Sequence, residues 1–196
     1  LLGATEMASF SGTNVKRDFV ELPSQMLEEW TWDRDMLAKI SSHYITGKSL
    51  PQEIISTILK LKHFDAGQFV KRQIALSKIS LELFAPGRIK DVDTIAQKIF
   101  SKLTHIYQST ENHFVASFGH LTGYGAKYYS YLWSRVFALD LFETIKQHGL
   151  LNSEIGHRYR NEVIGKGGSQ DPEILLKNFL GREPKSDAFF KELRLT

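Results

Sequence analysis

Histidine, tyrosine and glycine gather in one stretch of the chain, residues 118–133. These sixteen residues include three glycines, one histidine and four tyrosines. Histidine and tyrosine supply hydrogen-bond donors that can face a negative charge developing on a carbonyl oxygen. Glycine lets the backbone turn and approach a ligand closely. The composition therefore indicates a substrate-binding loop that leads into a helix. The candidate residues are His120, Gly123, Tyr124, Gly125, Tyr128 and Tyr131.

The same tyrosines also have a purely structural interpretation. If a helix begins near Ala126, Tyr128 and Tyr131 share one face, because residues three apart are neighbours on a helix. Aromatic side chains at a helix start can pack into a core while their hydroxyls find local partners. Tyr129 would point elsewhere, and we expect it in the core. Local sequence leaves the two interpretations open.

Glu21 is the second candidate for chemistry. It lies three residues after Asp18, which is the spacing of a capping box with Asp18 as the helix cap. The carboxylate could instead be a metal ligand, because catalytic zinc commonly takes two histidines and a glutamate. None of the seven histidines lies four residues from another, so the HExxH spacing that places two ligands on one helix face is absent. Local sequence by itself favours the cap.

Apolar residues recur at three- and four-residue spacing along most of the chain, which predicts an all-α fold of many helices. No stretch alternates in the manner of a strand. Without a linker to divide the chain, we expect one domain. The expected helices span about residues 18–47 with a break near Asp33, 51–66, 68–85, 91–106, 128–148, 152–164, 171–180 and 186–193.

Composition argues against several classes of function. The net charge is only +3 and the basic residues are scattered, so no nucleic-acid partner is expected. No apolar run approaches the length of a membrane span, so no membrane partner is expected either. The absence of cysteine excludes disulfides and thiolate metal sites. Residues 165–168 lack the Walker spacing of a phosphate loop and are expected to end a helix.

Two long segments carry a family resemblance. Residues 10–33, FSGTNVKRDFVELPSQMLEEWTWD, and residues 118–142, FGHLTGYGAKYYSYLWSRVFALDLF, are similar to the C-terminal part of the thimet oligopeptidase family. This family of zinc endopeptidases includes neurolysin, oligopeptidase A and mitochondrial intermediate peptidase. The resemblance implies that residues 1–196 are the C-terminal part of a zincin-like, multi-helix catalytic domain. Such an enzyme would hydrolyse short peptides.

The resemblance also implies roles for individual residues. Glu21 matches the third zinc ligand, and His120 matches a histidine that helps to bind the substrate or the transition state. Tyr131 matches the tyrosine that stabilises the oxyanion. Thimet-type members carry one more residue between the histidine and the loop tyrosine, Tyr124. The positions that match substrate-binding residues are Gly123, Tyr124, Gly125 and Tyr128.

The family's HExxH motif, which supplies two zinc ligands and the general base, would lie a short distance before Leu1. The resemblance therefore implies one zinc ion (Zn2+) whose remaining ligands lie outside this chain, and the N-terminal part of the same enzyme as a partner. We expect the 196 residues alone to bind zinc weakly and to cleave no peptide. A cytoplasmic location is expected, with the mitochondrial matrix as the alternative.

Two other functions compete with the peptidase interpretation. A non-catalytic helical interaction module that kept the fold would lack HExxH in the sequence upstream. A helical nucleic-acid binder would bind DNA in a salt-dependent manner. The basic net charge is its only support.

Overall fold

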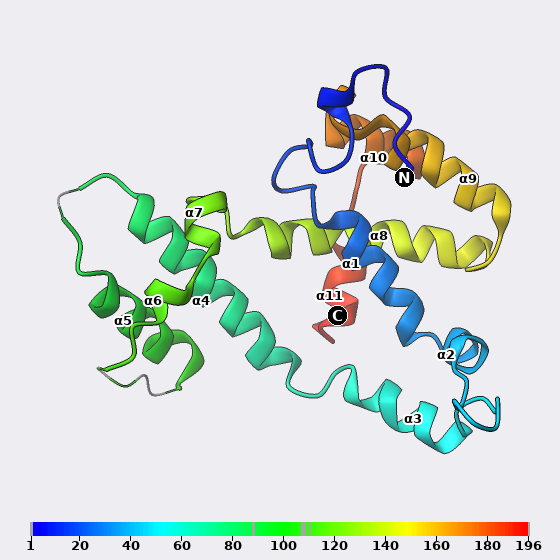
Figure 1. The fold of residues 1–196 in the computed structure, drawn as a ribbon, viewed down its shortest axis with the longest axis horizontal. Coiled ribbons are helices and arrows are strands. Elements are labelled where there is room, and N and C mark those ends of the chain that lie inside the picture. Colours follow the sequence, from blue (N-terminus) through cyan, green and yellow to red (C-terminus); the bar gives the residue numbers. More distant parts are fainter. Residues whose placement is uncertain (1, 88, 107–108, 110, 196) are drawn as a thin grey trace. The chain divides into compact units, whose positions relative to one another are not determined.

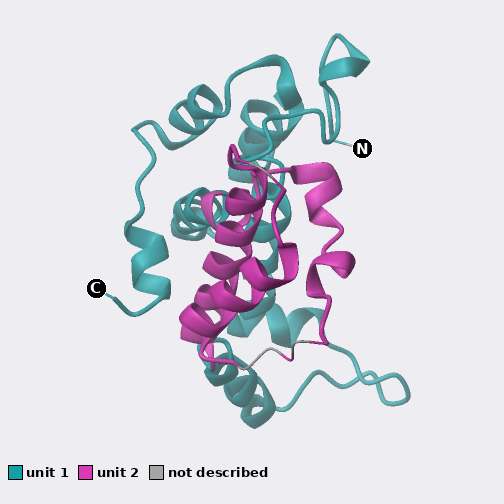
Figure 2. Cartoon of the chain, turned by 90° about the vertical axis from the view of Figure 1, so that its left-hand side faces the viewer, with its two compact units in different colours: residues 1–64, 134–196 teal, residues 65–133 magenta. Residues whose placement is uncertain are grey.

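A computed structural model describes residues 2–87, 89–106, 109 and 111–195 of the chain. Within these residues the regular structure is helical and includes no strand, which confirms the predicted all-α class (Figure 1). The chain divides into two compact units, drawn in separate colours in Figure 2. Unit 1 comprises residues 1–64 and 134–196, and unit 2 comprises residues 65–133. That both belong to one zincin-like catalytic domain stays a prediction.

The helices of unit 1 come from both ends of the chain. They are α1 (Leu22–Glu28), α2 (Arg34–Ile40), α3 (Gln52–Leu61), most of α8 (Ser130–His148), α9 (Ser153–Glu162), α10 (Pro172–Leu180) and α11 (Asp187–Glu192). Unit 1 also has the 3-10 helices η1 (Ala8–Phe10), η2 (Glu29–Trp32) and η3 (Ile164–Ser169). Unit 2 contains α4 (Ala66–Phe84), α5 (Val92–Thr104), α6 (Phe114–Ser117), α7 (His120–Tyr124) and the first turn of α8.

Several helix boundaries follow the local signals in the sequence. The predicted break near Asp33 is confirmed, because its carboxylate accepts hydrogen bonds from the first backbone N–H groups of α2. Asp91, Asn152 and Asp171 cap α5, α9 and α10 in the same way. Each cap satisfies donors that the first turn of a helix leaves without an intrahelical partner. Gly181 ends α10 in the left-handed conformation, with φ of 68°.

The predicted capping box at the first helix is wrong. Helix α1 begins at Leu22, after Glu21, and the Glu21 side chain makes no capping hydrogen bond. Before it, residues 17–21 form turns, in which the N–H groups of Phe19 and Val20 donate to the carbonyl of Lys16. Pro23 explains the later start, because a proline without an N–H group suits the first helical turn. The second expected boundary, at Gly47, is also wrong, since α2 ends at Ile40.

Unit 1 has a core in which α8 contacts helices from both ends of the chain. Leu22 and Met26 of α1 pack with Leu141 of α8 and with Phe179 of α10, and all four are almost completely buried. Fully burying such side chains contributes about 1.5–3 kcal/mol each to folding. The apolar face of α1 therefore holds the segment directly after Glu21 against α8.

A second core forms within unit 2. Ala75 and Ile79 of α4 pack against Ala96 and Phe100 of α5, and the four side chains are buried. The remaining buried members of this core are Leu76, Phe118 and Tyr128. Residues 118–133 therefore contribute two aromatic rings, those of Phe118 and Tyr128, to the core of unit 2.

Asp140 is a buried carboxylate that anchors the segment after α10 to α8 in unit 1. Both of its oxygens accept hydrogen bonds from Arg182, at 2.6 and 2.8 Å, and one also accepts from the backbone N–H of Lys185 at 2.8 Å. Two parallel bonds to a guanidinium are a strong arrangement. The hydrogen bond with Asp140 raises the pKa of Arg182.

The glycines at 165–168 serve close backbone packing in unit 1. The Ala4 N–H donates to the Gly165 carbonyl at 3.0 Å. A Cβ on Gly167 would lie 2.1 Å from the Phe10 carbonyl oxygen, and one on Gly168 would lie 2.1 Å from the Asn14 carbonyl oxygen. These glycines therefore let η3 approach the N-terminal segment, and the preceding helix α9 has already ended at Glu162.

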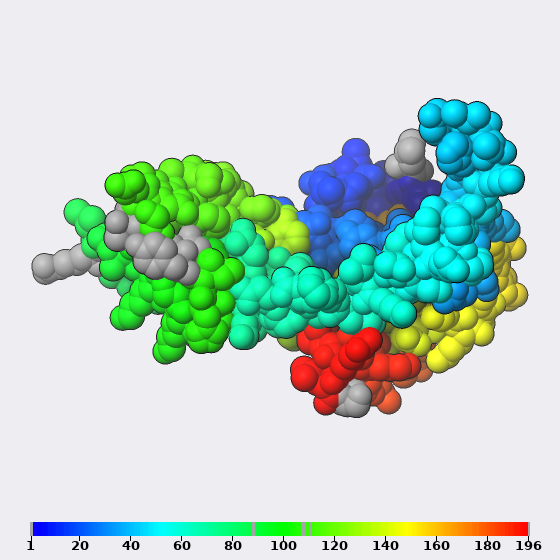
Figure 3. All heavy atoms as spheres, turned by 90° about the horizontal axis from the view of Figure 1, so that it is seen from below, coloured from blue at the N-terminus to red at the C-terminus, as the bar shows by residue number. Residues whose placement is uncertain are grey.

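Some apolar side chains of unit 1 remain at the surface. The connection between α2 and α3 exposes Tyr44 and Ile45, at 90% and 73%, in the light-blue segment of Figure 3.

Among the residues that the structure describes, none of the helices combines the length and the apolar character needed to cross a membrane.

Replacing Gly168 by alanine should lower the free energy of unfolding by about 2 kcal/mol, because the new methyl group would clash with the backbone at Asn14. Gly156 in α9 is the matched control, since a Cβ there meets no atom within 4 Å. Gly156→Ala should raise the free energy of unfolding by about 0.5–1 kcal/mol. Urea unfolding of the full chain measures both, and equal effects of the two substitutions would contradict the packing role.

Candidate functional site

The structure brings together the His120, Tyr124, Tyr128 and Tyr131 side chains, named here the aromatic cluster. His120 Nε2 lies 3.0 Å from the Tyr131 hydroxyl oxygen. The Tyr131 hydroxyl in turn donates to the Tyr124 hydroxyl at 3.3 Å. Because a phenol oxygen can accept as well as donate, the tautomer of His120 with a proton on Nε2 donates to Tyr131. Three predicted site residues are thus joined in one chain of hydrogen bonds.

The rings of the aromatic cluster also pack on one another. Those of Tyr124 and Tyr131 are stacked, with centroids 5.6 Å apart and planes 15° apart. The imidazole of His120 meets the three tyrosine rings nearly edge-on, at centroid distances of 5.1–5.6 Å. Edge-to-face and offset-stacked contacts at these distances are favourable. Ring packing therefore holds the hydroxyl groups of Tyr124 and Tyr131 in place.

The backbone that carries the cluster differs from the predicted loop. Residues His120–Tyr124 form helix α7, and α8 begins at Ser130 and not near Ala126. Among the glycines of this segment only Gly125 has a positive φ, of 56°, which favours glycine. The backbone conformation in this segment that favours glycine therefore lies at Gly125, after α7 and before α8.

Ser80 is a contributor that the sequence reasoning missed. It is completely buried, its hydroxyl donates to the Gly125 carbonyl at 2.6 Å, and it accepts from the Tyr128 N–H at 3.4 Å. It thus ties the turn at Gly125 to α4. The available signal was a serine directly after the buried Ile79, on an otherwise apolar helix face.

Burial separates the four tyrosines of this segment. Tyr124 and Tyr131 are half-buried, whereas Tyr128 is only 7% exposed and packs against Phe118 in the core of unit 2. Burial raises the pKa of Tyr128, and the charge of Arg72 partly offsets the rise. Tyr129 is 44% exposed, so its predicted place in the core is wrong.

Glu21 lies in unit 1, in the turn before α1, and its side chain is half-buried. Its neighbours Phe19 and Leu22 are buried at 5% and 0% exposure. The Glu21 carbonyl accepts hydrogen bonds from the Gln25 N–H and the Ser24 hydroxyl, each at 3.0 Å. The backbone at Glu21 is thus anchored on both sides.

Comparison with known proteins shows where this chain belongs. A sequence model described as "Peptidase family M3" matches residues 1–195. The chain belongs to peptidase family M3. This confirms the family that the two motifs predicted.

Individual relatives agree with the family match. The chain is 38% identical to saccharolysin of Saccharomyces cerevisiae over 204 residues, covering 100% of this chain and 28% of that protein. It is 38% identical to oligopeptidase A of Escherichia coli, with 97% of this chain and 29% of the relative covered. A mitochondrial intermediate peptidase of Arabidopsis thaliana is 30% identical, with 100% and 29% covered. This chain thus spans less than a third of the length of these relatives.

The donor set of a zinc site was sought among the residues that the structure describes. Within the described ranges, no group of three or more histidine, cysteine, aspartate or glutamate side chains is placed so that it could hold a metal ion. A catalytic zinc ion takes three protein ligands. A carboxylate such as that of Glu21 fits one of these positions and leaves the others to be supplied elsewhere.

The aromatic cluster of the M3 chain can stabilise a negative charge. The Tyr131 and Tyr124 hydroxyls are half-buried donors held by ring packing. Donors that are already positioned stabilise a developing oxyanion more effectively than donors that must reorganise. A hydrogen bond from His120 to the Tyr131 oxygen polarises the Tyr131 O–H bond and makes it a stronger donor.

Alkaline pH should destabilise the M3 chain through its buried tyrosines. Because burial raises the pKa of Tyr128 and Tyr159 above the unfolded value of about 10, their contribution to stability is full below pH 10. This contribution to stability is lost as the pH rises through the pKa values of the two tyrosines in the folded state. Tyr128→Phe should therefore reduce the fall in unfolding free energy above about pH 10.

Urea unfolding at a series of alkaline pH values measures this fall. Tyr44→Phe is the control, because Tyr44 is 90% exposed and should leave the pH dependence unchanged. An identical pH dependence for Tyr128→Phe and the unchanged protein would contradict the inferred rise in pKa.

Proposed function

We propose that this chain is the C-terminal part of a zinc metalloendopeptidase that hydrolyses short peptides. The hydrogen-bonded group of His120, Tyr124 and Tyr131 carries the proposal. Membership of family M3 and similarity to proteins named oligopeptidases support it. The chain spans less than a third of the relatives' length. The activity of the whole enzyme and its substrates are therefore part of the proposal.

Tyr131 is the proposed oxyanion donor. When water adds to the scissile carbonyl of a peptide, the carbonyl oxygen becomes negatively charged, and the Tyr131 O–H donates to it. In this step Tyr131 exchanges its hydrogen bond to Tyr124 for one to the substrate, while His120 continues to donate to the Tyr131 oxygen. Tyr124 is then left beside the substrate as a second donor. This division of roles follows from the hydrogen-bond order His120–Tyr131–Tyr124.

Glu21 is the proposed protein ligand from this chain to one Zn2+ ion. Bound zinc would polarise the scissile carbonyl and lower the pKa of a water molecule. The buried neighbours Phe19 and Leu22 hold the backbone of Glu21 in position. The remaining ligands would come from outside the 196 residues, so the chain alone should bind zinc weakly and lack peptidase activity.

The peptide would approach along the Gly123–Gly125 segment. A Cβ on Gly123 would meet no atom within 4 Å, so the space beside this glycine is open to a ligand. Tyr124 stands next to it and is half-buried. A direct contact from Tyr128 to the peptide stays a prediction, since its ring packs in the core of unit 2.

A cytoplasmic enzyme is the proposed setting, with the mitochondrial matrix as the alternative. Similar proteins of Arabidopsis thaliana are named as a probable cytosolic and as an organellar oligopeptidase A.

Tyr131→Phe in the intact enzyme should lower kcat for a short peptide about 10²–10³-fold, because it removes one donor to the oxyanion. The value of KM should change little, since this donor acts on the transition state and not on the bound peptide. Tyr129→Phe is the control, because Tyr129 is adjacent and 44% exposed. Unchanged kcat for Tyr131→Phe would refute the proposed catalytic role, and absence of HExxH upstream would favour the interaction module.

Glu21→Gln in the intact enzyme should reduce bound zinc about 10-fold or more, because an amide replaces an anionic ligand. Atomic absorption after dialysis against a metal buffer measures the zinc content. Glu28→Gln is the matched control, since it makes the same change on an exposed carboxylate of α1. Equal zinc contents in the two variants would show that Glu21 is not a ligand.

A further inference from the structure

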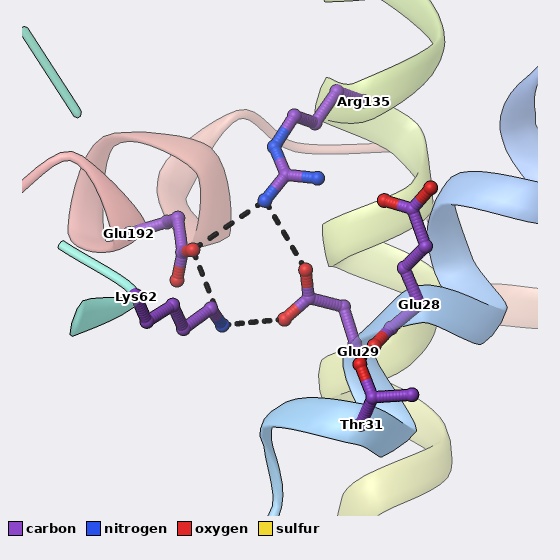
Figure 4. Close-up of polar contacts among 6 residues, drawn as sticks. All are labelled: Glu28, Glu29, Thr31, Lys62, Arg135 and Glu192. Carbon is purple, nitrogen blue, oxygen red and sulfur yellow. Dashed lines mark hydrogen bonds and ion pairs between the residues drawn. The ribbon is translucent and has the colours of Figure 1, made fainter. Parts of the chain in front are cut away.

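Four charged side chains in unit 1 form a closed network around one buried carboxylate, that of Glu29 (Figure 4). One oxygen of Glu29 lies 2.6 Å from Lys62 Nζ, and the other lies 3.1 Å from Arg135 Nη2. Glu192 of α11 completes the network, because one of its oxygens lies 3.2 Å from Lys62 Nζ and 3.4 Å from Arg135 Nη2. Two anions and two cations thus balance one another.

The network lies within unit 1, close in sequence to both points at which the chain passes from one unit to the other. These crossings lie at residues 64–65 and 133–134, and Lys62 and Arg135 are each within two residues of one of them. Glu29 is only 2% exposed, so its charge has little access to water. A buried carboxylate must be paired, which ties the two cations to one place. One side chain therefore holds two distant segments of unit 1, those of Lys62 and Arg135, at one place.

Arg135 lies four residues after Tyr131 in helix α8. Side chains at this spacing lie on the same face, one helical turn apart. The guanidinium of Arg135 is held by two carboxylates from separate segments, η2 and α11. The restraint on Arg135 thus acts one helical turn away from Tyr131 along α8. Small errors in the position of a catalytic group cost large factors in rate.

We propose that Glu29 is a positioning residue that acts through Arg135 and the first turns of α8 on Tyr131. This inference rests on the proposed catalytic role of Tyr131. Glu29 itself takes no part in the chemical step. Its function is to hold Arg135, while Lys62 and Glu192 complete the charge balance.

A double-mutant cycle on the intact enzyme tests the proposal, with Glu29→Gln, Tyr131→Phe and both together. Glu29→Gln alone should lower kcat about 10-fold or more, with KM nearly unchanged. In the Tyr131→Phe background, Glu29→Gln should lower kcat by less than about a further 2-fold, because the hydroxyl that Glu29 positions is already gone. Bound zinc should equal that of the unchanged enzyme.

Glu28→Gln is the matched control for the Glu29 substitution. Glu28 is the preceding residue, its carboxylate is exposed, and it points away from the network (Figure 4). The same loss of charge there should leave kcat unchanged.

The outcomes of the cycle separate the two proposals. If Tyr131→Phe lowers kcat but the effect of Glu29→Gln multiplies fully with it, the positioning role is overturned and the peptidase function stands. A fall in zinc content in Glu29→Gln would likewise overturn the positioning role, because the substitution would then act through the metal. If Tyr131→Phe leaves kcat unchanged, the proposed function and this inference fail together.

A second variant covers the case in which Glu29→Gln does not fold. Arg135→Lys keeps the positive charge, but an ammonium lacks the planar, multi-donor geometry with which Arg135 meets Glu29 and Glu192. It should lower kcat by a smaller factor than Glu29→Gln and show the same lack of additivity with Tyr131→Phe. Full additivity of Arg135→Lys with Tyr131→Phe would overturn the proposal.

Discussion

The hydrogen-bond ladder of helix α8 is the constraint on which the backbone that carries Tyr131 depends. Its 19 residues carry Tyr131 in the first turn and Ala138, Leu141 and Ile145 further along. An α-helix propagates its position from one turn to the next through its hydrogen-bond ladder. The later residues are buried in the core of unit 1, whereas Tyr131 packs against the core of unit 2. The hydrogen-bond ladder fixes the backbone at Tyr131, and ring packing within unit 2 fixes its side chain.

Buried carboxylates locate α8 more specifically than apolar packing can. Leucine and phenylalanine contacts tolerate small shifts, because the hydrophobic effect has no direction. Asp140 accepts two hydrogen bonds from Arg182, and Glu29 takes one cation on each oxygen. Replacing such pairs by apolar residues can be neutral for stability, whereas leaving one charge unpaired costs about 3–5 kcal/mol. We interpret these pairs as elements of specificity, since each penalises any displacement of α8 that would separate its partners.

The aromatic cluster combines a rigid base with accessible donors. Tyr128 and Phe118 lie in the core of unit 2, while Tyr124 and Tyr131 remain half-buried above the Ser80-bound turn at Gly125. Rings packed at 5–6 Å lose little further freedom when a ligand arrives. The structural interpretation thus holds for Tyr128, which supports the residues that can donate, and the substrate-binding interpretation stays a prediction.

The sequence by itself determined the class of fold, most helix boundaries and the family. Helical periodicity, caps such as Asp33 and the stop at Gly181 are local signals, and local geometry is sufficient to read them. Pro23 was visible too, yet its shift of the α1 start past Glu21 was missed, because proline at a first turn competes with the capping-box pattern. The sequence singled out His120, Tyr124 and Tyr131 by the composition of one stretch, and hydrogen bonds join the three side chains.

Only the tertiary structure decided which polar residues became buried partners. Glu29, Lys62, Arg135 and Glu192 are separated by up to 163 positions in the sequence, so no local pattern marks them as one network. Ser80 and the glycines at 167–168 are likewise explained by contacts with distant backbone atoms. The physical reason is that pairing in low-dielectric surroundings depends on burial, and burial is a property of the packed chain and not of any one segment.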